Sequence, residues 1–199
     1  GQDVSKSKTW NEDNDKSKLF IYDPETREFD LLFEDPTYDV AGPVGGCRTA
    51  DGGAAIDEKT NELIYVSYYA EKPERLIFNE ELKESYEMIL GHFIADRGED
   101  VVVRPVTWSK DRNKVVYSVS SSSNPGEYWY FDKENIILSF LWERSPWIDR
   151  TKLAKKVPMN YTARDGLEIY GYLTIPVGSD GKNLPMVVHP HGGPTARDT

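Results

Sequence analysis

The sequence predicts a mainly β protein built from short antiparallel strands. Short apolar runs recur along the chain with turn residues between them, as at 19–23 and 29–33. A similar pair of runs returns at 129–132 and 136–140, and the last apolar run, 186–189, leads into two adjacent glycines. Runs of β-branched and aromatic residues bounded by turn residues are typical of strands and hairpins.

The same criteria place the individual elements. One helix is predicted over 80–95, because Asn79 can cap its first turn and apolar residues follow at helical spacing. The apolar face expected of this helix is Leu82, Tyr86, Ile89 or Leu90, and Phe93. Strands are predicted at 19–23, 29–33, 54–57, 63–69, 75–78, 101–109, 114–120, 127–132, 136–142, 157–163, 167–175 and 186–189.

The repeated pair of runs indicates how these strands are organised. Residues 20–23 and 29–33 have the sequences FIYD and FDLLF, and residues 129–132 and 136–140 have WYFD and IILSF. If a four-stranded propeller blade takes about 40–50 residues, the two copies lie two blades apart. The repeat therefore predicts a partial β-propeller of about two and a half antiparallel blades before Glu143, with the helix replacing one outer strand. A small independent antiparallel domain is the alternative.

The last predicted strand ends in the loop His191-Gly192-Gly193-Pro194. Glycine permits positive φ and a close approach of the backbone to a ligand, and proline has no N–H, so the two glycines carry the backbone donors here. An α/β-hydrolase places such a loop after its third strand, where an amide faces the oxyanion of a tetrahedral intermediate. An ordinary turn is the alternative. The chain contains no G-x-S-x-G nucleophile motif.

Two motifs around this loop resemble the start of the catalytic domain in the prolyl oligopeptidase family of serine peptidases, in its acylaminoacyl-peptidase-like and dipeptidyl-peptidase-like branches. They are YTARDGLEIYGYLTIP at 161–176 and LPMVVHPHGGPTARD at 184–198. The resemblance implies that residues 1–143 are the C-terminal blades of a β-propeller, 144–156 an inter-domain connector, and 157–199 the N-terminal part of a truncated α/β-hydrolase domain. Thr195 departs from the aromatic residue that family members often carry there.

The resemblance also implies a function, that of a serine peptidase which hydrolyses short peptides through an acyl-enzyme. Gly193 is the expected oxyanion-hole donor, Gly192 its neighbour, and His191 either orients the loop or makes a plain structural hydrogen bond. The Ser–Asp–His triad is expected beyond residue 199, so this chain alone is expected to hold no catalytic residue and to be inactive. The propeller is expected to restrict access to the site.

Two other functions remain open at this point. The first is an ester or lipid hydrolase of the same fold, although such enzymes carry loops of the H-G-G-G type and Pro194 stands fourth here. The second is a β-propeller that serves as a protein-interaction module. This alternative does not explain the motifs in residues 157–198.

The amino-acid composition limits which molecules the chain is expected to bind. The formal net charge is −10, with 24 Lys and Arg against 34 Asp and Glu, which disfavours binding to nucleic acid or to anionic membrane surfaces. Cys47 is the only cysteine, and no His/Cys/Asp/Glu cluster has zinc-like spacing, so neither metal nor cofactor is expected. No apolar run approaches the roughly 20 residues that span a bilayer. The protein is expected to be soluble, and the sequence leaves open whether its compartment is the cytoplasm or the periplasm.

The strand predicted at 186–189 raises a pairing problem. In the family, the fourth strand of the hydrolase sheet lies between the second and the third, and no fourth strand is present here. Unpaired backbone groups on a strand attract other strands or leave the segment irregular. This segment is therefore expected to be irregular or to cause self-association. His189 is expected in the core, and three apolar residues are expected to anchor the connector to a domain surface: Trp147, Ile148 and Leu153.

Overall fold

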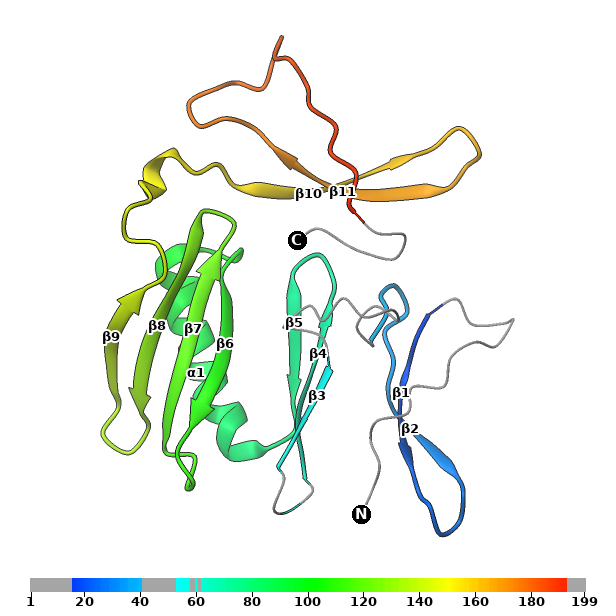
Figure 1. Ribbon diagram of the computed structural model, residues 1–199, viewed down its shortest axis with the longest axis vertical. Helices are drawn as coiled ribbons and strands as arrows, with labels where there is room; N and C mark the ends of the chain where they lie inside the picture. Colours follow the sequence, from blue (N-terminus) through cyan, green and yellow to red (C-terminus); the bar gives the residue numbers. More distant parts are fainter. Residues whose placement is uncertain (1–15, 41–52, 58–59, 61, 193–199) are drawn as a thin grey trace. The chain divides into compact units, whose positions relative to one another are not determined.

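The computed structural model describes residues 16–40, 53–57, 60 and 62–192 (Figure 1). Strands dominate these residues and form antiparallel sheets, which confirms the mainly β class. The chain divides into two units, residues 1–83 with 189–199 and residues 84–188. The assignment of the sheets to propeller blades and of the chain to two domains stays a prediction.

The first unit holds a hairpin and a three-stranded sheet. The hairpin pairs β1 (Leu19–Tyr22) with β2 (Phe29–Phe33), and the sheet has the order β3 (Gly53–Ile56), β4 (Leu63–Tyr69), β5 (Pro73–Ile77). All these pairings are antiparallel, as predicted from the turn residues between the apolar runs. In β4 Ile64 and Val66 are buried while Tyr65 between them is half-exposed, the period-two pattern of a strand with one face in a core.

Helix α1 (Glu80–Arg97) begins where the sequence predicts. The side chain of Asn79 accepts a hydrogen bond from the Leu82 amide at 3.1 Å and so caps the first turn. Two acidic residues lie in the first turn of the helix and Arg97 lies in its last turn. Both placements interact favourably with the helix dipole. The buried face consists of Leu82, Ser85, Ile89 and Phe93. Ser85 was not among the residues predicted for this face.

A four-stranded sheet forms the core of the second unit, with α1 against one of its faces (Figure 1). Its order is β6 (Val102–Trp108), β7 (Lys114–Ser121), β8 (Asn124–Asp132), β9 (Ile137–Glu143). The contacts between helix and sheet include a hydrogen bond from the Tyr117 hydroxyl to Ser85 Oγ at 3.0 Å and an edge-on contact of the Phe93 ring with Trp129 at 5.3 Å. Five buried apolar side chains line the sheet: Val103, Val115, Tyr117, Val119 and Phe131.

The turn between β7 and β8 is tighter than the sequence predicts. The strands predicted at 114–120 and 127–132 leave six residues between them, yet β7 continues to Ser121 and β8 begins at Asn124. The Asn124 side chain accepts from the Gly126 amide at 3.1 Å, and Gly126 has a φ of +135°, a conformation that glycine tolerates. Local hydrogen bonding of this kind lets a polar segment with turn residues start a strand.

The segment after the sheet contains a short 3-10 helix, η1 (Arg150–Lys152), capped by Asp149. The role of residues 144–156 as an inter-domain connector stays a prediction, and one of the anchors expected for it is wrong, because Trp147 is 79% exposed. The predicted hairpin follows as β10 (Lys156–Thr162) and β11 (Glu168–Thr174). Gly166 takes a φ of +87° in the turn between these strands.

The segment 183–192 does not form the predicted strand. Val187 is 89% exposed, and Met186 and Val188 are nearly as open. His189 is also exposed, so its expected place in a core is wrong. A strand forms only where a neighbouring strand pairs with it, and none of the described strands pairs with these residues, which agrees with the expectation of an irregular segment.

The described part of the chain contains no helix that combines the length and the apolarity needed to cross a membrane.

Replacing Phe93 by alanine tests the packing of α1 on the sheet. Phe93 is 1% exposed, and deleting a buried aromatic side chain typically costs about 3–5 kcal/mol of stability. Met88 on the same helix is 42% exposed, so Met88→Ala should cost less than about 0.5 kcal/mol. Urea unfolding of the two variants measures the difference. Equal losses of stability would contradict this packing.

Candidate functional site

The glycine loop predicted as the oxyanion site is only partly described. His191 and Gly192 are exposed, and His191 Nδ1 lies 2.9 Å from the carbonyl oxygen of Gly192, so a proton on Nδ1 is donated to that oxygen. A Cβ placed on Gly192 would meet nothing within 4 Å. Gly193 lies outside the described residues, as do Pro194, Thr195, Arg197 and Asp198. The oxyanion role of Gly192 and Gly193 stays a prediction.

The hairpin before this loop has two unlike faces. Its register pairs Val157 with Leu173 and Tyr161 with Ile169, so these apolar side chains share one face with Met159. Val157 is 55% exposed and Tyr161 56%. The opposite face carries polar groups, among them Asn160 and Glu168, whose side chains are hydrogen bonded at 2.6 Å. An isolated two-stranded hairpin is marginal in water, so this apolar face needs a further layer.

A buried carboxylate in the second unit lies at the centre of a cluster of polar side chains. Glu127 on β8 is 4% exposed. Its Oε2 accepts from Arg97 Nη1 at 2.8 Å and from Trp129 Nε1 at 2.7 Å. Its Oε1 accepts from Asn124 Nδ2 at 3.1 Å and from Arg150 Nη1. Both carboxylate oxygens thus have two donors each.

The two arginines of this cluster have further partners. Arg150 Nη2 donates to Glu143 on β9, so its guanidinium joins two carboxylates of adjacent strands. The Arg97 guanidinium lies 4.8 Å from the centre of the Phe93 ring, where it makes a cation–π contact. Asp96 also lies 3.2 Å from Arg97 Nε. The cluster therefore holds its charges in pairs, which is the condition for burying them.

The pKa of Glu127 follows from these contacts. Burial raises the pKa of its carboxyl, but the hydrogen bonds from Arg150, Arg97 and Trp129 outweigh burial and lower the pKa below its ordinary value. The group is therefore ionised and fully engaged, which suits a structural anchor and not a general base. The sequence motifs do not identify Glu127 as a site residue. The available signal was its place on the inward-facing register of β8, shared with Trp129 and Phe131.

The repeated FIYD and WYFD segments also have a structural purpose. Each ends in an aspartate that caps the turn that follows. Asp23 Oδ1 accepts from the Glu25 amide at 2.8 Å, and Asp132 Oδ1 accepts from the Asn135 amide at 3.2 Å. The pKa of Asp23 is lowered mainly by the Glu25 amide, and that of Asp132 mainly by the Asn135 side chain. Both carboxylates fix hairpin turns.

No group of His, Cys, Asp and Glu side chains suited to a metal ion occurs among the residues whose placement is described.

The comparisons with known proteins point to peptidases. No family model matches the chain. It is 26% identical to "Dipeptidyl aminopeptidase BIII" of Pseudoxanthomonas mexicana, over 91% of this chain and 25% of that protein. It is 24% identical to "Dipeptidyl peptidase family member 6" of Caenorhabditis elegans, over 76% of this chain and 23% of that protein. The chain thus spans about a quarter of the length of these curated relatives, and the similarity indicates a relationship to peptidases.

The ionised state of Glu127 predicts how stability changes with pH. Because folding lowers its pKa, the carboxylate stabilises the fold above its ordinary pKa of about 4.5, and this contribution is lost as pH falls below that value. Near pH 7, the substitution Glu127→Gln should lower the free energy of unfolding by about 2 kcal/mol, because hydrogen bonds to a charged group contribute on this scale. At about pH 3 the difference from the native chain should shrink.

Urea unfolding at the two pH values measures this effect. Glu87→Gln is the control, because Glu87 is exposed on α1 and its replacement should change little at either pH. If Glu127→Gln lowered the free energy of unfolding equally at both pH values, the result would contradict an ionised carboxylate at this position.

Proposed function

We propose that this chain is part of a serine peptidase of the prolyl oligopeptidase family, in its dipeptidyl-peptidase-like branch, that releases dipeptides from short peptides. The observation that carries the proposal is the similarity to "Dipeptidyl aminopeptidase BIII" over 91% of the chain, which extends beyond the C-terminal motif. The H-G-G-P loop at 191–194 supports it independently, because hydrolases of the α/β fold use glycine loops to bind an oxyanion.

In this proposal the sheets before Glu143 are the last blades of a β-propeller, and residues 157–199 begin an α/β-hydrolase domain. Two features support the division. The turns of the β1–β2 and β8–β9 hairpins share the same aspartate cap, as expected of equivalent strands in repeated blades. The hairpin β10–β11 presents an apolar face that a larger domain would bury.

The proposed chemistry follows the acyl-enzyme route. A serine from the part of the protein beyond residue 199 attacks the peptide carbonyl, a histidine accepts the serine proton and delivers it to the leaving amine, and an aspartate orients that histidine. Negative charge develops on the carbonyl oxygen during attack. The amides of Gly193 and its neighbour Gly192 donate to this oxygen, and His191 holds the loop through the carbonyl of Gly192.

Two other functions make different predictions. An ester or lipid hydrolase of the same fold would favour ester over amide substrates. A propeller that serves only as an interaction module would lack any downstream serine, aspartate and histidine. The peptidase names of both relatives favour the first proposal over these two.

Activity measurements on a longer form of the protein test the proposal. We expect release of p-nitroaniline from a dipeptidyl p-nitroanilide, abolished by a serine-directed phosphonate, and no turnover by the 199-residue chain alone. Gly193→Pro removes one oxyanion donor and should lower kcat by about a hundredfold or more while KM changes little. A preference for esters, or phosphonate-sensitive hydrolysis by the 199-residue chain, would contradict the proposal.

Amide exchange tests the proposed domain division. In the 199-residue chain the amides of Met186 to His189 should exchange quickly, because these residues are exposed and form no strand. In the longer protein they should be protected by a neighbouring strand. Concentration-dependent protection in the short chain would indicate the proposed strand-mediated self-association. Equally fast exchange in both forms would argue against a hydrolase sheet.

A further inference from the structure

The connector after β9 is attached to the four-stranded sheet at three points along its length. At its start the Arg144 amide donates to the carbonyl of Gly126 at 2.8 Å. In its middle Arg150 donates to Glu127 and Glu143. Near its end Lys155 Nζ lies 3.5 Å from Asp100 Oδ1. A flexible linker would show no such series of contacts with one neighbouring sheet.

The middle attachment is the strongest of the three. Glu127 is buried, and Arg150 is one of only two donors to its Oε1, the other being Asn124. Withdrawing Arg150 would leave part of a buried negative charge without compensation and would remove a partner of Glu143. Breaking a buried pair costs far more than breaking an exposed one. The attachment through Lys155 is exposed and longer, so it contributes little.

Local hydrogen bonds hold Arg150 in place for this contact. Asp149 Oδ1 caps η1 and accepts from the amide and the hydroxyl of Thr151, at 3.1 Å and 2.6 Å. The amides of Lys152 and Leu153 donate to the carbonyls of Asp149 and Arg150, each at 3.1 Å. The backbone around Arg150 is thus folded on itself, and its side chain needs little further ordering to reach both carboxylates.

We propose that Arg150 fastens the connector to the β6–β9 sheet, so that the connector moves with the sheet, and that the flexible joint of the chain lies at Lys155 and Lys156, where β10 begins. The weak final attachment and the exposed start of β10 place the joint there. Motion of the following hairpin relative to the sheet is then a rotation about one short segment. This inference does not depend on the proposed peptidase activity.

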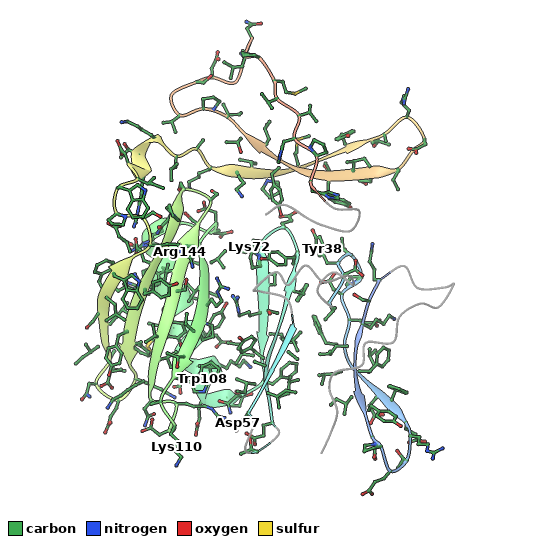
Figure 2. All side chains as sticks on the ribbon, viewed as in Figure 1. Tyr38, Asp57, Lys72, Trp108, Lys110 and Arg144 are labelled. Atoms are coloured by element: carbon green, nitrogen blue, oxygen red, sulfur yellow. The ribbon has the colours of Figure 1, made fainter. Side chains whose placement is uncertain are left out.

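Hydrogen exchange in the intact protein tests the fastening. In the native protein the amides of Lys152 and Leu153 should be protected. Arg150→Gln should speed their exchange by about tenfold or more, because a charge-assisted hydrogen bond to a buried group is lost, and should leave β7 and β8 protected. The control is Arg144→Gln at the residue labelled in Figure 2. Arg144 donates to the Tyr128 hydroxyl at 3.2 Å and pairs with no carboxylate among the described residues. This variant should behave like the native protein.

Limited trypsin digestion of the same proteins locates the joint. Cleavage after Lys155 or Lys156 should precede cleavage after Lys152 in the native protein, and Arg150→Gln should make Lys152 as susceptible as the joint. Three results would overturn the inference: fast exchange of Lys152 and Leu153 in the native protein, no change in Arg150→Gln, or loss of protection throughout β7 and β8 in that variant.

Discussion

The burial of one negative charge organises the second unit of this chain. Glu127 points from β8 into the interface between the sheet and α1, where a charged group is tolerated only if its hydrogen bonds are satisfied. The donors come from three places: Arg97 at the end of α1, Trp129 and Asn124 on β8 itself, and Arg150 in the connector. Helix, sheet and connector cannot separate without leaving this charge unpaired.

In the C-terminal part of the chain, by contrast, apolar side chains remain exposed. The hairpin β10–β11 has an apolar face that nothing in the described structure covers fully, and Val187 is almost completely exposed. Such surfaces are rare on independent soluble domains and mark places where other segments pack. The chain spans about a quarter of its curated relatives, and the proposed catalytic domain would supply those segments.

The sequence predicts features that depend on neighbouring residues. The hairpins follow from alternating apolar residues and turn residues, and the start of α1 follows from the Asn79 cap. Prediction from the sequence fails where contacts between residues distant in the chain decide whether a side chain is buried or a strand forms. Ser85 is buried because Tyr117 bonds to it from β7, and the run at 186–189 has strand composition but no neighbouring strand. The contacts of Glu127 with Arg97 and Arg150 could not be predicted for the same reason, since both arginines lie far from Glu127 in the sequence.

The predicted catalytic loop depends on distant residues in the same way. His191 and Gly192 are in local contact, but an oxyanion site exists only relative to a nucleophile, which this proposal places beyond residue 199. The most direct measurement is a crystal structure of the longer protein after reaction with a serine-directed phosphonate. We expect a phosphonylated serine whose phosphoryl oxygen lies about 3 Å from the amide nitrogen of Gly193 or Gly192. A modified serine remote from this loop, or an oxygen bound by other donors, would contradict it.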